Sequence, residues 1–285
     1  MENRNKMKIR KLALFIPFLV ACSSPVNEHP LPKPTSTPTP TSTKEQSYNV
    51  LFIGNSFTHY NDLEVVSQNV GQDIGLDITC DRVATSAFHL YEHADATNPT
   101  GQLVEEKLKN NTYTHVIIQE HSTYPVSNYQ GFLNGATALV NKIRTYQKYA
   151  TIRLYQTWGF ENMVGNYGNT IPECENALCE AYKKVGKALN INIHYVGKAF
   201  TKSYLDNPDI NIYYSEDNKH PSFAGTYLSA LIHILSLSGK KLDNLSYRGV
   251  EGSSNQYGET YLTSEVAEKL KSTATYIYQN YGINY

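Results

Sequence analysis

The sequence predicts an α/β fold in which helices cover both faces of a parallel sheet of about five strands. Three observations indicate this class: short apolar segments recur along the chain, segments with helical periodicity separate them, and polar residues follow several of the apolar segments. Wholly apolar strands suit a sheet that is buried on both faces. The alternation of strands with helices is typical of an open, doubly wound sheet.

Each strand is expected where apolar residues run together. The predicted strands fall at 50–53, 78–83, 116–118, 152–155 and 193–196. The predicted helices fall at 62–73, 101–109, 129–147, 173–189, 223–238 and 263–280. In the helix over 223–238, Tyr227, Leu231 and Ile234 lie on one apolar stripe at helical spacing, which indicates a face packed against the sheet.

The first 47 residues are expected to form a signal peptide and a tether. Residues 1–22 combine five basic residues, an apolar run at 12–21 and a final Cys22, and they resemble a lipoprotein signal peptide whose cysteine is lipidated. The run is short for a bilayer span; an uncleaved anchor, or an ordinary signal peptide with a chance cysteine, is the alternative. Residues 23–47 are rich in Pro, Thr and Ser, which favours an extended tether. Residues 48–285 then fit one domain.

Charge and cysteine content exclude several classes of protein and site. Removal of residues 1–21 takes away five basic residues and one acidic residue, which leaves a net charge of −5. Nucleic-acid binding would call for a basic face, so no nucleic-acid partner is expected. Of Cys80, Cys174 and Cys179, the last two lie on one predicted helix, with Cα atoms about 8.6 Å apart. A disulfide spans at most ~7 Å, so no disulfide is expected, and no cysteine-rich zinc spacing is present.

Polar segments are expected to meet at one edge of the sheet, because the carboxyl ends of parallel strands lie together and form the ligand site of such folds. Residues 55–56 follow the first strand, 119–122 follow the third and 156–159 follow the fourth. Residues 217–220 precede the last long helix before the C-terminal one. This edge is therefore the expected functional site.

Two of these segments supply the three groups that make a hydroxyl into a nucleophile. Ser56 carries the hydroxyl, His220 can take its proton, and Asp217 can hold the imidazole in one tautomer. Backbone N–H groups converge where a strand meets a helix, as expected at Ser56, and they favour an anion there. Singly, Ser56 could equally cap a helix, and Asp217 with His220 could form a solvated turn. The catalytic interpretation depends on the three together.

The same segments resemble the motifs of a known superfamily. Ile-Gly-Asn-Ser-Phe-Thr at 53–58 resembles the first motif of the SGNH, or GDSL-like, hydrolases, with Asn for the commoner Asp. Asp-x-x-His-Pro-Ser at 217–222 resembles their last motif. The likeness covers most of 48–240, although its specific part is about twenty residues. It implies a three-layer, flavodoxin-like α/β/α fold.

The resemblance also implies roles for individual residues. Ser56 would be the nucleophile, His220 the base and Asp217 the residue that orients it, and no cofactor or metal would be needed. Asn55 is a tentative substrate-binding residue. Trp158 would stack on a sugar ring, or it would fill a gap in the core. A further pair, His89 and His93, has the i, i+4 spacing of metal ligands, but no third ligand with motif spacing accompanies it.

The expected oxyanion hole departs from the family pattern. The family uses the backbone N–H of the serine, a glycine N–H after the second strand and an Asn side chain after the third. Here the segment after the second strand, residues 84–90, is the second block of the family pattern and contains no glycine. The N–H of Ser86 or Ala87 would therefore donate instead. Gln119 stands where Asn is common, and its amide would donate together with the N–H of Ser56. Loss of one such donor typically costs ~10²–10³ in turnover.

We therefore predict an SGNH-type serine esterase that is lipid-anchored to a bacterial membrane outside the cytoplasm. Its expected substrate is an O-acyl, in particular O-acetyl, ester on a carbohydrate, because the Gln119 block resembles that of several carbohydrate acetylesterases and the tether points outward. The rival hypothesis is a catalytically degenerate, glycan-binding surface lipoprotein, which the missing glycine suggests. A solute-binding lipoprotein fits less well, since such proteins are usually longer and have two lobes. The sequence assigns no oligomeric state and no role to residues 240–285.

Overall fold

A computed structural model describes residues 46–282, so the predicted signal peptide and Cys22 lie outside the described residues, as does nearly all of the tether. Five parallel strands form one sheet in the order β2-β1-β3-β4-β5. Their bounds are β1 (Ser47–Gly54), β2 (Asp77–Ala84), β3 (His115–Ile118), β4 (Thr151–Tyr155) and β5 (Asn192–His194). The predicted α/β fold with a five-stranded parallel sheet is confirmed.

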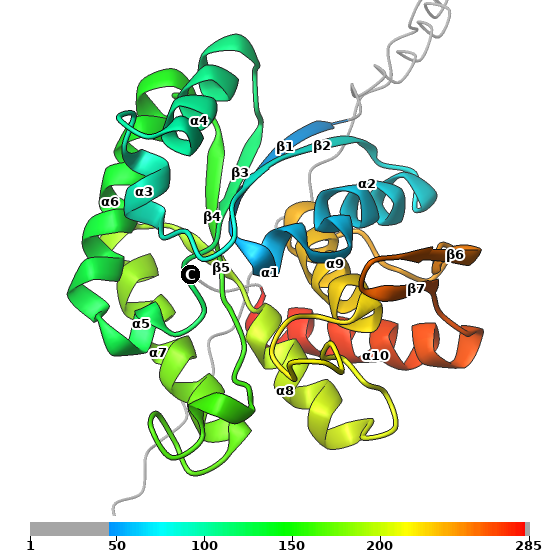
Figure 1. Ribbon diagram of the computed structural model, residues 1–285. Helices are drawn as coiled ribbons and strands as arrows, with labels where there is room; N and C mark the ends of the chain where they lie inside the picture. Colours follow the sequence, from blue (N-terminus) through cyan, green and yellow to red (C-terminus); the bar gives the residue numbers. More distant parts are fainter. Residues whose placement is uncertain (1–45, 283–285) are drawn as a thin grey trace, which may run out of the picture. The chain divides into compact units, whose positions relative to one another are not determined.

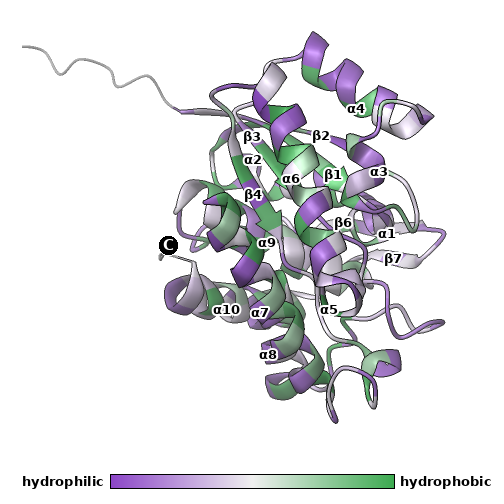
Figure 2. Cartoon of the chain, turned by 90° about the vertical axis from the view of Figure 1, so that its left-hand side faces the viewer, coloured by the Kyte–Doolittle hydropathy of each residue, from purple (hydrophilic) through white to green (hydrophobic). Residues whose placement is uncertain are grey.

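Helices form a layer on each face of the sheet (Figure 1). One layer contains α2 (Leu63–Asp73), α8 (Val196–Asp206), α9 (Phe223–Ser238) and α10 (Ser264–Tyr281). The other contains α3 (Leu90–Ala94), α4 (Pro99–Asn110), α5 (Tyr124–Ser127), α6 (Tyr129–Tyr146) and α7 (Ile171–Leu189). The strands are predominantly hydrophobic, whereas polar residues dominate the outer faces of most helices (Figure 2). The core therefore lies between the sheet and the two layers.

Strand β1, which lies between β2 and β3, ends at the carboxyl edge of the sheet. Residues 50–53 of this strand are fully buried, which explains the apolar run in the sequence. Ile53 pairs with Ile118 of β3, and Gly54 pairs with Ala84 of β2. The order of strands along the chain reverses between β1 and β3, and in doubly wound sheets ligands bind at that point. The residue that follows β1 is thus placed at the functional edge.

The short helices α3 and α5 were not predicted, and three further parts of the structure differ from the predicted elements. β5 ends at His194 rather than at 196, because α8 begins at Val196. Helix α8 itself was not predicted. Residues beyond 240 contribute an antiparallel hairpin of β6 (Gly249–Asn255) and β7 (Gly258–Tyr261). Its strands are largely exposed and carry few apolar residues, so the sequence has no strand-like apolar signal there.

Two further observations concern the chain between residues 46 and 282. None of its helices combines the length and the apolar character that a bilayer span requires. Cys80, Cys174 and Cys179 are free thiols.

Candidate active site

Ser56 is the first residue of the short helix α1 (Ser56–His59), immediately beyond β1. Asn55 caps this helix, because its Oδ1 accepts a hydrogen bond of 3.2 Å from the backbone N–H of Phe57. Gly54 is required for the tight approach: a Cβ there would lie 2.3 Å from Thr58 Oγ1. Within residues 46–282, no group accepts a hydrogen bond from the backbone N–H of Ser56. That N–H is available to an anion at the helix start.

The Asp217–His220 segment folds into a tight turn that brings acid and base together. Asn218 adopts left-handed backbone angles, with φ 51°. The turn lets Oδ1 of Asp217 accept from the backbone N–H groups of both Lys219 and His220, each at 2.9 Å. The other carboxylate oxygen, Oδ2, lies 2.5 Å from Nδ1 of His220. Aspartate side chains favour such turns because they bond to backbone N–H groups two and three residues on.

The three predicted groups form one hydrogen-bonded chain. Nε2 of His220 lies 2.8 Å from Oγ of Ser56, although the two residues are 164 positions apart in the sequence. Partial burial raises the pKa of Asp217, but the hydrogen bonds from the His220 ring and from two backbone N–H groups outweigh it and leave this pKa below its usual value. The Asp217 side chain is 34% exposed and that of His220 is 17% exposed. The carboxylate is therefore ionised at neutral pH, and substrate can reach the imidazole.

Gln119, the predicted side-chain donor of the oxyanion hole, lies against the turn that carries the nucleophile. Its side chain is fully buried behind the nucleophile. Oε1 accepts from the backbone N–H of Asn55 at 3.0 Å and from the Thr58 hydroxyl at 2.8 Å. Its amide donates to Oδ1 of Asn55 at 3.0 Å and to the carbonyl of Glu120. Both amide hydrogens are thus engaged in this geometry, in which Gln119 fixes the turn that carries Ser56, and its oxyanion role stays a prediction.

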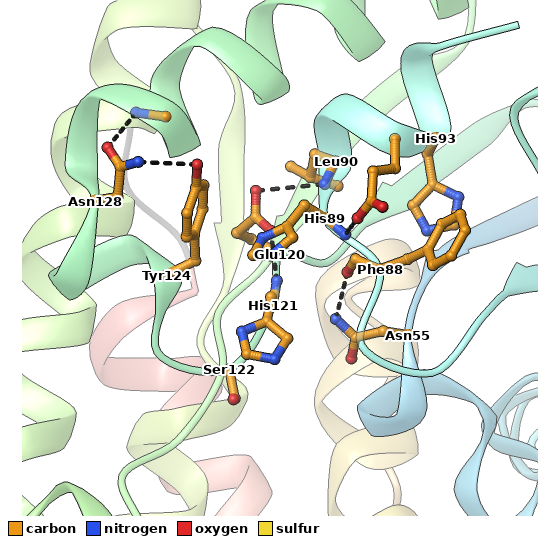
Figure 3. Close-up of polar contacts among 12 residues, drawn as sticks. Asn55, Phe88, His89, Leu90, His93, Glu120, His121, Ser122, Tyr124 and Asn128 are labelled. Atoms are coloured by element: carbon orange, nitrogen blue, oxygen red, sulfur yellow. Dashed lines mark hydrogen bonds and ion pairs between the residues drawn. The ribbon is translucent and has the colours of Figure 1, made fainter. Parts of the chain in front are cut away.

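The two tentative substrate-binding residues are also structural in this geometry. Asn55 is buried, and its Nδ2 donates to the carbonyl of Phe88 at 3.0 Å (Figure 3). Trp158 is fully buried and is stacked between Phe57, at 4.2 Å between ring centroids, and Phe200, at 3.9 Å. Its indole N–H donates to the carbonyl of Lys219 at 2.9 Å. Of the two alternatives for Trp158, the structure supports core filling. The buried indole also supports the catalytic turn through its hydrogen bond to Lys219.

The second block lies beside the turn of α1. The Ser86 hydroxyl is 2.8 Å from Nε2 of His59, three residues after the nucleophile. Ala87 has φ 64°, a left-handed conformation that favours glycine. The backbone there has a conformation that glycine adopts readily, although the residue is alanine. Among the described contacts, none occupies the N–H of Ser86 or Ala87, so both stay candidates for the oxyanion hole.

Several residues at the site were not predicted from the sequence. His59 lies near His220, and burial, together with the charges of Arg82 and His220, lowers its pKa. Tyr60 stacks directly on the ring of His220. Both residues follow Ser56 by only three and four positions in the sequence. That closeness could have predicted that they lie at the site. Their partners come from distant segments, and no spacing in the sequence indicated them.

The histidine pair at 89 and 93 does not form a metal site. Nε2 of His93 is 2.8 Å from the carbonyl of Gly54 and its ring is buried, whereas Nδ1 of His89 is 3.0 Å from Oε1 of Glu120. Figure 3 shows His89 and Glu120 in contact while His93 points elsewhere. In the part of the chain that the structure describes, no group of three potential ligands could hold a metal ion.

Comparisons with known proteins give structural relatives only. No protein-family model and no curated protein matches the chain. The chain is similar to a candidate SGNH hydrolase from Slackia heliotrinireducens, with 20% identity and a TM-score of 0.58 over 68% of this chain and 100% of that one. It is also similar to a DUF4886 family protein from Bacteroides uniformis, with 17% identity and a TM-score of 0.67 over 82% and 95% of the two chains. The fold is that of the SGNH, or GDSL-like, hydrolases.

Proposed function

We propose that this chain is a serine esterase that hydrolyses O-acyl esters through an acyl-enzyme intermediate. The observation that carries the proposal is the relay of two hydrogen bonds, 2.5 Å from Asp217 to His220 and 2.8 Å from His220 to Ser56. These distances allow proton transfer without rearrangement. The similarity of the fold to SGNH hydrolases supports the same conclusion.

In this proposal each of the three groups has a defined step. The Asp217 carboxylate accepts from Nδ1–H of His220 and so leaves the lone pair on Nε2, facing the serine hydroxyl. His220 takes the Ser56 proton as Oγ attacks the acyl carbonyl, and it returns that proton to the departing alcohol. Water then attacks the acyl-serine, again deprotonated by His220, which releases the acid and restores the hydroxyl. Backbone N–H groups of Ser56 and of Ser86 or Ala87 would hold the negative oxygen in both steps.

A small acyl group, in particular acetyl on a carbohydrate, is the proposed substrate. A cavity of about 970 Å³ lies beside the catalytic turn and is lined in part by Tyr204, Leu205 and Asn218, but Ser56 and His220 are not among its lining residues. A long acyl chain would need an apolar pocket that reaches the nucleophile. This cavity does not reach it, which favours a small acyl group. The carbohydrate part rests on the proposed location outside the cytoplasm, on a lipid-anchored Cys22 and its tether. The engaged amide of Gln119 no longer supports it.

A second candidate is the degenerate, glycan-binding lipoprotein. The observation that favours it is that the amide of Gln119, the one side-chain donor predicted for an oxyanion, is engaged in other hydrogen bonds. The two candidates differ in whether Ser56 is an activated nucleophile.

Labelling with a fluorophosphonate probe separates the two candidates. We expect covalent labelling of the unaltered chain, none of Ser56→Ala, and full labelling of Ser127→Ala, a matched change at an exposed serine in α5. Hydrolysis of p-nitrophenyl acetate, butyrate and octanoate then tests the acyl group, with acetate expected to be fastest. Absence of labelling in the unaltered chain, with retained binding to a polysaccharide, would establish the second candidate. Preference for octanoate would overturn the acetyl proposal.

A further inference from the structure

The β6–β7 hairpin has little core of its own. Val250 is 62% exposed, and most residues of both strands face solvent. An isolated two-stranded hairpin is marginally stable in water, so contacts with the rest of the domain must hold it. Figure 1 draws it next to α9, and the contact of Tyr257 with Tyr60 ties it to the segment that follows α1. Its two-residue turn, Gln256 and Tyr257, points back to the catalytic edge.

The base of the hairpin is fixed to the start of α9. Gly249 has φ 97°, and a Cβ there would lie 2.1 Å from the carbonyl of Thr260 and 2.8 Å from the ring of Phe223. Glycine therefore lets β6 lie directly against the first residue of α9, three positions after His220. The Tyr227 hydroxyl of α9 donates to the carbonyl of Tyr247 at 2.8 Å. These contacts fix the orientation of the hairpin relative to α9.

The tip of the hairpin ends a stack of three rings on the catalytic imidazole. Tyr257 stacks on Tyr60 with 3.9 Å between ring centroids and 17° between planes. Tyr60 stacks on His220 with 4.2 Å and 8°. Tyr214 meets both tyrosines edge-on, at 6.1 and 5.9 Å. Both faces of Tyr60 are therefore covered, and its ring transmits the position of the hairpin tip to His220.

A buried carboxamide provides a second link between the hairpin and the catalytic segment. Asn61 donates to the carbonyl of Pro221 at 3.1 Å and to the Thr226 hydroxyl at 3.0 Å. Its own Oδ1 accepts from Nδ2 of Asn255 in β6 at 3.2 Å. Asn61 has φ 52°, and such strained residues persist where surrounding contacts fix them, commonly at functional sites.

We propose that Tyr60 and Tyr257 are positioning residues for His220, and that the β6–β7 hairpin thereby belongs to the catalytic machinery. The inference rests on the proposed esterase function. The bonds to Asp217 and Ser56 hold the imidazole at its two nitrogens but leave the ring free to tilt about the line between them. The ring of Phe57 meets the imidazole edge-on at 5.5 Å, and the stacked face of Tyr60 removes the freedom to tilt. An aromatic face also stabilises the imidazolium that forms when His220 takes the serine proton.

Substitution of Tyr257 tests this inference. In Tyr257→Ala we expect kcat for p-nitrophenyl acetate to fall about 3- to 10-fold, the range that corresponds to one aromatic pair, while KM changes less than twofold. Tyr257→Phe keeps the stack and should restore kcat. Tyr149→Ala is the matched control, because Tyr149 is 89% exposed and precedes the opposite end of β4. Asn255→Ala, which removes the link to Asn61, should lower kcat in the same way.

A measurement without turnover keeps this inference separate from the proposed function. In ¹H–¹³C spectra, ring currents from Tyr60 should displace the Cε1–H signal of His220. We expect this signal to move in Tyr257→Ala and to return in Tyr257→Phe. An unmoved signal would overturn the positioning role whether or not the chain is active, as would a kcat for Tyr257→Ala equal to that of Tyr149→Ala. A moved signal in a chain that never labels with fluorophosphonate would overturn the esterase proposal alone.

Discussion

The regions behind and in front of Ser56 both consist of polar and aromatic residues, yet they are held in opposite ways. Behind the serine, Asn55, Gln119 and Trp158 are buried, and their polar groups are engaged with one another and with the backbone. In front, Asp217 and His220 are partly exposed and are held by one turn and a ring stack. The rear region determines where the hydroxyl is, and the front region determines what it can do.

The difference follows from the free energy of burying polar groups. A buried donor or acceptor left without a partner costs about 1–3 kcal/mol, so the rear network is stable only when it is complete. The front contacts are exposed to water, and each contributes little to folding. Substitutions behind Ser56 should therefore act on stability, and substitutions in front should act on turnover.

The largest expected effect is that of Asp217→Asn on turnover. The amide oxygen of Asn can still accept from the two backbone N–H groups, so the turn should persist. The negative charge is lost, and an amide NH₂ facing Nδ1 would favour the wrong tautomer of His220. We expect kcat to fall about 10⁴-fold with a melting temperature that changes by no more than a few degrees. A loss below tenfold in steady-state kinetics would show that Asp217 does not orient the base.

Gln119→Leu should show the opposite behaviour. It removes the partners of the Asn55 N–H, the Thr58 hydroxyl and Asn55 Oδ1 in a site without water access. We expect a loss of about 4 kcal/mol in the free energy of unfolding, measured by urea denaturation. Gln130→Leu on the exposed face of α6 is the control and should change stability by less than about 0.5 kcal/mol. If Gln119→Leu instead lowered kcat 10²–10³-fold at unchanged stability, Gln119 would be an oxyanion donor after all.

The sequence predicted the fold because the buried strands and helices leave a periodic signal. The runs at 50–53 and 116–118 fall within β1 and β3, and the helix predicted at 223–238 coincides with α9. The three residues were predictable because Ser56 follows the end of a strand and Asp217 and His220 stand in a recognisable turn before a long helix. Whether these residues act as predicted is left to the experiments proposed above.

What the sequence did not predict has two physical causes. Gln119, Asn55 and Trp158 follow strands in the way that site residues do, and residue type does not reveal whether a polar group faces the substrate or a neighbour in the core. Tyr257 lies 197 positions from Tyr60, on a hairpin without apolar periodicity. Such long-range ring contacts leave no local signal. The comparison of the two regions could therefore only be made on the structure.

The buried histidines extend the comparison to pH. His93 touches the back of the site through Gly54, and burial lowers its pKa to about 4. The unfolded chain binds this proton near pH ~6.5, so the contribution to stability is complete above that pH and is lost as pH falls from ~6.5 to ~4. The loss amounts to about 3 kcal/mol for this one residue. Urea denaturation from pH 7 to 4 should show it.

His93→Gln isolates the contribution of this residue. A glutamine amide can donate to the Gly54 carbonyl but does not titrate. The slope of unfolding free energy against pH between 6 and 4 should fall by up to ~1.4 kcal/mol per pH unit. An unchanged slope would mean that other groups cause the acid sensitivity.

The smallest expected effect concerns Ala87, which adjoins both regions. Its left-handed backbone costs a non-glycine residue roughly 1–2 kcal/mol, and glycine would relieve that cost. Glycine also gives the unfolded chain more freedom, which offsets about 0.4–1 kcal/mol. We therefore expect Ala87→Gly to stabilise the chain by about 0.5 kcal/mol. Because an oxyanion donor at this position would be the backbone N–H, kcat should stay within twofold. A large change in kcat at unchanged stability would show that the methyl group, and not only the N–H, shapes the space for the acyl group.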